Sequence, residues 1–218
     1  MALIAIGDVH GCANTLERLL ERIAPGPSDH LVFVGDYVDR GPDSKRVIDI
    51  LLRLREHVEC TFLKGNHEAL MLDYLDYGEY DLWRMNGGAT TLSSYQKSNR
   101  EVEIPAEHIS FIRDAPLYLD TPNYFFVHGG IPPTMTVEEA IRLGDEQMFL
   151  WERGHLSARR YRWEKTLVCG HTPRPHPIDT EKLLAIDTGC VYFMRPDMGR
   201  LTAVRLPERE FVFEAYSG

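Results

Sequence analysis

Residues 3–11 read LIAIGDVHG, an apolar run that ends directly in a loop with an aspartate and a histidine between two glycines. The same kind of unit recurs as LVFVGDYVDRG at 31–41 and as TFLKGNHE at 61–68. The stretches between these units carry apolar residues at helical spacing, and Asn14 with Glu17 three residues later predicts a capping box at the start of the first helix. Alternating strand and helix predict a parallel βαβαβ arrangement with both helices on one face of a sheet.

The rest of the chain changes character twice. From residue 68 to about 115 the sequence is helical and loop-rich, which is typical of a cap over a site. Beyond it, short apolar runs separated by turn residues predict a second, β-rich sheet. These runs span 124–127, 167–169, 183–186, 201–206 and 211–213. We therefore expect an α/β fold, with two mixed β-sheets packed as a sandwich and flanked by helices, in a single domain over residues 1–218.

The composition argues against several functions. The chain has 218 residues, of which 44% are hydrophobic and 26% charged, as in ordinary globular domains. Its net charge of −9 disfavours nucleic acid as a partner. No apolar run reaches the roughly 18 residues of a membrane helix, and the start of the sequence lacks the features of a signal peptide. The four cysteines are scattered, so we expect reduced thiols in a cytoplasmic protein.

Six side chains that can bind metals follow strand ends of both predicted sheets: Asp8, His10, Asp36, Asn66, His128 and His171. One such residue alone usually caps a turn, but six together are typical of a metal site. Asp8 and His10 stand two apart, so both point to one side of an extended segment and can chelate one ion. A set of oxygen and nitrogen ligands without sulfur favours Mn, Fe or Zn. Six ligands for two ions imply one shared carboxylate, as in two-metal phosphoryl chemistry.

The segments that carry these residues are GDVHG, GDYVDRG, GNHE, HGG and GHT, between residues 7 and 172. In order and spacing they resemble the phosphoprotein phosphatase family of calcineurin-like metallophosphoesterases, in particular its bacterial and phage-type branch. The resemblance implies two divalent ions, Mn²⁺ first, with Fe or Zn as alternatives. It assigns to the first metal Asp8, His10 and Asp36. It assigns to the second metal Asp36, Asn66, His128 and His171, with Asp36 bridging the two.

The same resemblance implies catalytic roles for four further residues. His67 matches the general acid that protonates the leaving oxygen, and Asp39 matches the carboxylate that orients it. Arg40 matches a clamp on the phosphate oxygens, and Arg153, in the segment WER at 151–153, matches a second clamp. The implied reaction is direct attack by a metal-bridging hydroxide, without a covalent phosphoenzyme.

Within this family we predict a phosphomonoesterase that acts on phosphoserine and phosphothreonine in proteins. The presence of Asp39, the short segment between His128 and His171, and the acidic net charge favour that class. Its substrate would be a phosphoprotein or a phosphorylated small molecule. The alternative is a symmetrical diadenosine tetraphosphatase, which would be favoured by a basic pocket of Arg153, Arg159, Arg160 and Arg162. A non-catalytic binding module is disfavoured because every expected ligand and the expected acid are present.

Three other features have simpler readings. Asp187, in the segment DTG at 187–189, resembles a family strand end near the second metal site, but a tight structural turn is the favoured interpretation. Trp83, with Tyr74, Tyr77 and Tyr80, could line a substrate groove, but ordinary packing is the favoured interpretation of this aromatic cluster. The loop 193–199 is longer than bacterial relatives usually have there, so we expect it to alter the rim of the site.

Overall fold

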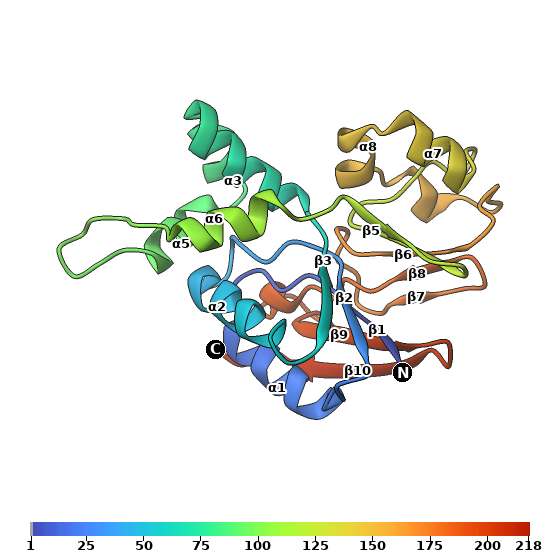
Figure 1. Cartoon of the computed structure of the whole chain (residues 1–218), viewed down its shortest axis with the longest axis horizontal. Helices are drawn as coiled ribbons and strands as arrows, with labels where there is room; N and C mark the ends of the chain where they lie inside the picture. Colours follow the sequence, from blue (N-terminus) through green and yellow to red (C-terminus); the bar gives the residue numbers. More distant parts are fainter. Residues whose placement is uncertain (1) are drawn as a thin grey trace.

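The computed structural model describes residues 2–218, which form two five-stranded sheets (Figure 1). The first sheet has the order β10-β9-β1-β2-β3. Its strands are β1 (Leu3–Ile6), β2 (His30–Phe33), β3 (Glu59–Phe62), β9 (Arg200–Leu206) and β10 (Glu210–Ala215). The first three are parallel, as the sequence predicts, whereas β9 runs antiparallel to both β1 and β10. Ala5 of β1 therefore lies between Val32 of β2 and Val204 of β9.

The second sheet has the order β4-β5-β6-β8-β7. Its strands are β4 (Tyr118–Asp120), β5 (Tyr124–Val127), β6 (Thr166–Cys169), β7 (Ile178–Asp179) and β8 (Leu183–Ala185). Strands β5, β6 and β8 are parallel, and the outer strands β4 and β7 are antiparallel to their neighbours. The apolar runs 201–206 and 211–213 belong to the first sheet, so the prediction that they join the second is wrong. They pair there because β2 occupies only one side of β1, and β9 satisfies the backbone groups on the other.

The two sheets pack face to face through fully buried apolar side chains. Val32 and Val34 from the first sheet and its following loop meet Phe126, Val168 and Leu184 from the second. Burying an aliphatic or aromatic side chain of this size contributes about 1.5–3 kcal/mol relative to exposure. The predicted fold class, α/β with two mixed sheets flanked by helices, is confirmed.

Helices α1 (Ala13–Ile23) and α2 (Ser44–Leu54) cover the outer face of the first sheet (Figure 1). The predicted capping box at the start of α1 is not formed, because the helix already begins at residue 13, after Cys12. Asn14 and Glu17 instead accept hydrogen bonds from the guanidinium of Arg46 on α2. These contacts tie the two helices to each other and leave the start of α1 without a side-chain cap.

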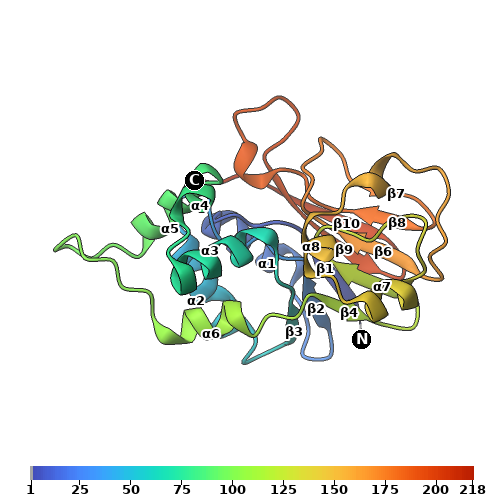
Figure 2. The same ribbon diagram turned by 90° about the horizontal axis from the view of Figure 1, so that it is seen from above.

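Four helices occupy the segment after β3 and gather at one end of the molecule, away from α7 and α8 (Figure 2). They are α3 (Asn66–Tyr77), α4 (Tyr80–Met85), α5 (Gly88–Ser94) and α6 (Ala106–Arg113). Helices α7 (Val137–Leu143) and α8 (Glu146–Trp151) pack on the second sheet, followed by the short 3₁₀ helix η1 (Gly154–Ser157). A second 3₁₀ helix, η2 (Cys190–Tyr192), precedes β9. Within residues 2–218 no helix is both long and apolar enough to span a bilayer.

Candidate metal centre

The loops that follow β1, β2, β3, β5 and β6 meet at one end of the sandwich and bring two groups of ligand atoms together. In the first group, His10, Asp36 and His67 place one possible ligand atom each within 4.8 Å of the others. In the second group, Asp36, His128 and His171 do the same. All five residues are buried. Asp36 belongs to both groups, so a single carboxylate joins them.

The two oxygens of Asp36 face different histidines. Oδ2 lies 3.4 Å from Nε2 of His10, and Oδ1 lies 3.4 Å from Nε2 of His128. The backbone N–H of His67 donates a hydrogen bond to Oδ1 at 3.1 Å. Burial by itself raises the pKa of Asp36, but its electrostatic interactions with the surrounding imidazoles, that of His128 first, outweigh burial and hold the pKa far below its usual range. Asp36 is therefore an ionised carboxylate, with one oxygen facing His10 in the first group and the other facing His128 in the second.

The orientation of His10 fits a bound cation. Its Nδ1 lies 2.9 Å from the carbonyl oxygen of Val38, and because a carbonyl only accepts, Nδ1 carries the proton. The lone pair of Nε2 then faces the carboxylate of Asp36. Two electron-rich groups that face each other repel, and a positive charge between them would remove the repulsion. In this structure Nη1 of Arg40 provides some of that charge, 2.7 Å from Nε2 of His10. A divalent ion would satisfy the same demand with shorter, directional bonds.

The second group has the same character. Nδ1 of His128 lies 2.8 Å from the carbonyl oxygen of Val34, so its Nε2 presents a lone pair. That atom lies 2.9 Å from Oδ1 of Asn66 and 3.2 Å from Nδ1 of His171. Burial lowers the pKa of His171 to about 2, which keeps its ring neutral and able to act as a ligand. These oxygen and nitrogen atoms fit the donor set of a divalent metal.

Asp8 lies in neither group, although the resemblance assigns it to the first metal. Its buried carboxylate accepts the backbone N–H of His171, with Oδ2 at 2.9 Å, and so ties the loop after β1 to the loop after β6. A Cβ atom at Gly170 would come within 2.0 Å of Oδ1, so only glycine fits there. Burial and the charges of Asp187 and Asp36 raise the pKa of Asp8. A cation between Asp8 and Asp36 would relieve this repulsion.

The loop that presents Asp36 is strained and is held by Glu68. Asp36, Asp39 and Arg40 have φ values of 55°, 71° and 66°, in the left-handed region that non-glycine residues rarely adopt. The buried carboxylate of Glu68 accepts the backbone N–H groups of Asp36 and Tyr37 at 2.8 Å, and those of two further residues. Burial and the Asp36 charge raise the pKa of Glu68 to about 7. A strained backbone of this kind persists only where surrounding contacts hold it, and the four hydrogen bonds to Glu68 are such contacts.

His67 is oriented by a buried network around Asp39. Nδ1 of His67 lies 2.7 Å from Oδ2 of Asp39. The indole N–H of Trp83 on α4 donates to the same carboxylate at 2.9 and 3.0 Å, and the hydroxyl of Thr91 on α5 donates to it at 2.7 Å. Nε2 of His67 is buried and has no hydrogen-bond partner among residues 2–218. The ring therefore keeps one nitrogen for a reacting group, 3.9 Å from Asp36.

Trp83 and Thr91 are residues that the motifs did not reveal. Their distance from Asp39 in the sequence is large, and neither stands in a recognisable pattern, so no sequence signal could have assigned them to the site. Asp187, in contrast, makes a local hydrogen bond, in which its Oδ1 accepts the N–H of Gly189 at 2.8 Å. It is also buried beside Asp8, whose pKa its charge raises.

Arg40 and Arg153 lie beside different ligand groups. Arg40 contacts His10, as described above. Arg153 is exposed after α8, where its Nε donates to the hydroxyl of Thr172 at 3.3 Å. Its charge acts on His171 and, after burial and the charge of His128, helps to lower the pKa of that histidine. An anion bound over the two groups would meet one guanidinium on each side.

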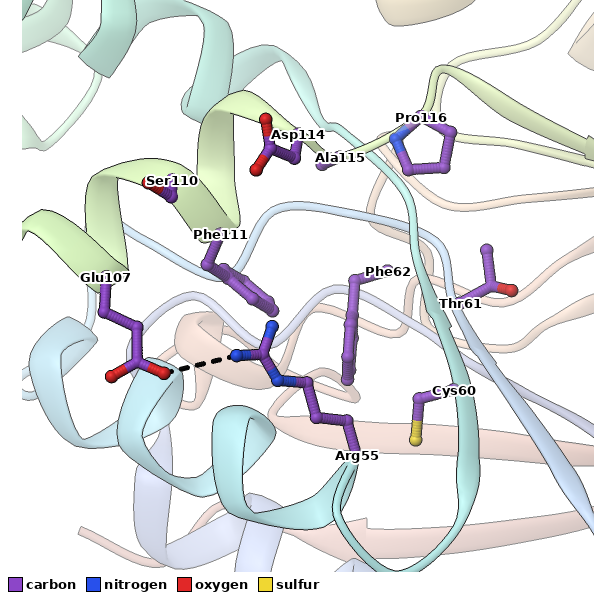
Figure 3. A pocket seen from close by; sticks show the side chains of 10 residues that line it. All are labelled: Arg55, Cys60, Thr61, Phe62, Glu107, Ser110, Phe111, Asp114, Ala115 and Pro116. Carbon is purple, nitrogen blue, oxygen red and sulfur yellow. Dashed lines mark hydrogen bonds and ion pairs between the residues drawn. The ribbon is translucent and has the colours of Figure 1, made fainter.

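A separate pocket of about 490 Å³ lies between β3, the end of α2 and α6 (Figure 3). Phe62 and Phe111 line it, and the side chains of Arg55 and Glu107 form an ion pair across it at 3.2 Å. None of its lining residues belongs to either ligand group. The chemistry of the molecule is therefore concentrated at the strand ends and not in this pocket.

The fold and the site define a metallophosphoesterase. The sequence profile of the calcineurin-like phosphoesterase family matches residues 1–204, and the chain belongs to that family of hydrolases. Family members use a dinuclear metal site, and the two groups around Asp36 provide candidate ligands for it. The resemblance inferred from the sequence is thereby confirmed.

Two sequence relatives and one solved structure that resemble this chain carry the names of dinucleotide hydrolases. A bis(5'-nucleosyl)-tetraphosphatase PrpE [asymmetrical] from Oceanobacillus iheyensis is 31% identical, over 97% of this chain and 91% of its own. The protein of that name from Anoxybacillus flavithermus is 29% identical, over 95% of this chain and 91% of its own. A crystal structure of a protein provisionally named diadenosine tetraphosphatase superposes with a TM-score of 0.73 at 25% identity, over 100% of this chain and 95% of that one.

The sequence-based prediction of a serine/threonine protein phosphatase is contradicted by these relatives. Its error has a physical origin, because the five motifs encode metal binding and proton transfer, which both classes share. The arguments from Asp39 and from the short segment between His128 and His171 did not separate the classes. The net charge of −9 was also misleading, since it describes the whole surface and not the two arginines beside the ligand groups.

Proposed function

We propose that this chain hydrolyses dinucleoside tetraphosphates asymmetrically, to one nucleoside triphosphate and one nucleoside monophosphate. The observation that carries the proposal is the similarity, across 97% of the chain, to a relative named bis(5'-nucleosyl)-tetraphosphatase [asymmetrical]. The alternative weighed from the sequence is the symmetrical enzyme, which would yield two diphosphates. The relatives' printed name favours the asymmetrical reaction.

We further propose that residues 1–218 act as one metallophosphoesterase domain that holds two divalent cations, with Mn²⁺ as first choice. The first cation is assigned to Asp8, His10 and Asp36. The second cation is assigned to Asp36, Asn66, His128 and His171. When bound, two such ions supply positive charge that lowers the pKa of water and neutralises phosphate oxygens.

His67 is the proposed proton donor to the leaving oxygen. Its Nδ1 is fixed on Asp39, and its free Nε2 faces the side of the site where Asp36 lies. Burial disfavours the charged ring, but the Asp36 charge and the hydrogen bond with Asp39 outweigh burial and raise the pKa of His67. Trp83 and Thr91 hold the Asp39 carboxylate in place and so keep the ring in one orientation. A fixed, protonated imidazole can then pass a proton to a phosphate oxygen as its bond to phosphorus breaks.

Arg40 and Arg153 are the proposed contacts to the polyphosphate. A tetraphosphate chain is a polyanion, which the net charge of −9 would repel without local positive charge. Arg40 beside the first ligand group and Arg153 beside the second supply that charge on both sides. Guanidinium groups bind phosphate oxygens with two parallel hydrogen bonds, which also fixes the orientation of the chain.

Chromatography of the products tests this proposal directly. The protein is loaded with Mn²⁺ and incubated with diadenosine tetraphosphate, and AMP, ADP and ATP are separated over time. We expect AMP and ATP in equal amounts, and no products above background with the matched variant Asp36→Asn. Two equivalents of ADP would refute asymmetrical cleavage. Release of nucleotides no faster than by Asp36→Asn would refute the substrate class.

A further inference from the structure

A pocket of about 460 Å³ opens beside the first ligand group, and Arg40 is the only residue of its lining that the proposed mechanism uses. Its lining residues are Arg40, Met85, Asn86, Gly87, Val191 and Tyr192. Arg40 also contacts His10, so the pocket continues directly from the candidate metal centre. A site of this volume is within the range that holds small organic ligands.

The pocket has two walls from distant parts of the chain. The turn between α4 and α5 forms one wall, where Met85 is 79% exposed and Gly87 packs closely on Arg40. The 3₁₀ helix η2 forms the other wall with Val191 and Tyr192, just before the loop 193–199. Both segments line the same pocket, so they lie side by side although they are about 100 residues apart in the sequence. A flat group could be held between the thioether of Met85 and the side chains of η2.

The charge of the pocket favours an anionic ligand with an aromatic part. Of the six lining residues none is acidic, although the chain as a whole carries a net charge of −9. The guanidinium carbons of Arg40 and Arg195 lie over the ring of Tyr192, 5.6 and 4.6 Å from its centre, so two cations accompany the aromatic wall. A phosphate at Arg40 would leave the group attached to it facing Tyr192. Aromatic rings and guanidinium planes both stack well on nucleobases.

Asn86 adds a polar contact on the opposite wall. Its Nδ2 donates to the carbonyl oxygen of Leu82 at 2.9 Å, which fixes the side chain at the end of α4. The amide oxygen is thereby left as an acceptor for the exocyclic amine of a base. Thioether, aromatic ring, arginine and amide together match the parts of a nucleotide better than those of an extended peptide.

We infer that this pocket binds one nucleoside of the substrate, with its base between Met85 and Tyr192 and its nearest phosphate at Arg40. The inference rests on the proposed function, and it identifies Tyr192 and Met85 as specificity-determining residues. It also gives the loop 193–199 a role, because Arg195 from that loop lies over the ring of Tyr192.

The test compares a nucleotide substrate with one that has no nucleoside. For the Mn²⁺-loaded protein, kcat/KM is measured with diadenosine tetraphosphate and with p-nitrophenyl phosphate, and the ratio of the two is taken. Removing a stacking ring commonly weakens base binding by about tenfold or more. We therefore expect Tyr192→Ala to lower the ratio by about tenfold, mainly through KM, and Met85→Ser to lower it in the same direction. Tyr192→Phe, which keeps the ring, should restore it.

A control variant in the same loop is Met194→Ala, because Met194 is 84% exposed and does not line the pocket. Its ratio should equal that of the wild type. If the wild type cleaves diadenosine tetraphosphate and the Tyr192→Ala and Met85→Ser ratios also equal it, the pocket inference is overturned while the proposed function stands.

A second readout separates the two proposals when diadenosine tetraphosphate is not cleaved. AMP and inorganic phosphate are compared as inhibitors of p-nitrophenyl phosphate hydrolysis. AMP should inhibit the wild type more strongly than phosphate does, and Tyr192→Ala should lose that advantage. An AMP inhibition constant equal to that of phosphate in the wild type would overturn the nucleoside pocket, whatever the fate of the proposed function.

Discussion

Replacing Glu68 with glutamine should destabilise the protein by about 2–6 kcal/mol. Each oxygen of this buried carboxylate accepts two backbone N–H groups, Oε1 those of Tyr37 and Val38, and Oε2 those of Asp36 and Gly65. Glutamine has almost the same shape, but one of its two terminal atoms is an NH₂ group. Whichever way the amide turns, two buried N–H groups lose their acceptor, and each unpaired group costs about 1–3 kcal/mol.

Glu139 provides a matched control. It holds the same third position of its helix, α7, and its carboxylate accepts the N–H of Thr136 at 2.8 Å. Its side chain is 34% exposed, so water can replace the lost acceptor in Glu139→Gln. Both variants are unfolded in urea and followed by circular dichroism, in excess chelator so that metal binding does not contribute. We expect a large fall in the free energy of unfolding for Glu68→Gln and a small one for Glu139→Gln.

Equal shifts for the two variants would refute the idea that Glu68 holds the strained loop. The loss predicted for Glu68→Gln is large against a typical domain stability of 5–15 kcal/mol. Because the loop carries Asp36, we also expect phosphatase activity toward p-nitrophenyl phosphate to fall in Glu68→Gln at temperatures where the variant is still folded. Full activity in a destabilised variant would mean that the loop keeps its shape without these bonds.

The remaining predictions concern the metals, the acid, the close glycine packing and pH. Removal of divalent ions with a chelator should abolish turnover, and elemental analysis after reconstitution with Mn²⁺ should find two ions per chain; full activity with one or none would contradict this. His67→Asn should lower kcat by about 10²–10⁴-fold for alkyl phosphate esters and less for p-nitrophenyl phosphate, whose leaving group needs less protonation; equal losses would count against a role as acid. Gly170→Ala should reduce both activity and stability because its Cβ would meet Asp8 at 2.0 Å, whereas Gly26→Ala, with 3.7 Å to its nearest neighbour, should be tolerated in a thermal melt. Burial and then the charge of Arg174 lower the pKa of His155 to about 4. Between about pH 6.5 and 4, His155 therefore binds a proton in the unfolded chain but not in the folded one. The free energy of unfolding should fall by up to about 3 kcal/mol as the pH falls through this window. The fall should be smaller in His155→Gln than in the wild type.

Much of the fold could be predicted from the sequence because several apolar runs end directly in loops of glycines and polar residues. The apolar run 124–127 coincides with β5, and the run 3–6 coincides with β1. The pairing of β9 with β1 could not be predicted, because an alternating or apolar run identifies a strand but not its neighbour. The capping box predicted at the start of α1 was wrong because tertiary contacts decide where a polar side chain bonds. The side chain of Asn14 accepts a hydrogen bond from Arg46 on another helix.

The site was predicted at the level of its motifs. His10, Asp36, His128 and His171 do converge, because strand ends of a packed sheet pair must meet at one edge. The support around Asp39 was missed, since Trp83 reaches it from a helix that no motif connects to the strand ends. The substrate class was missed because it depends on surface pockets and charges around the motifs, which have no fixed sequence pattern.

The place of β1 in its sheet has a consequence for how the protein is made. β1 ends at Ile6 and its neighbour β9 begins only at Arg200, so the ribosome makes β1 long before it makes this partner. During translation one side of β1 therefore lacks its partner, and an unpaired strand edge can pair with other chains. Truncation before β9 should thus yield aggregated chains, because the centre of the first sheet depends on a segment that is made long after β1.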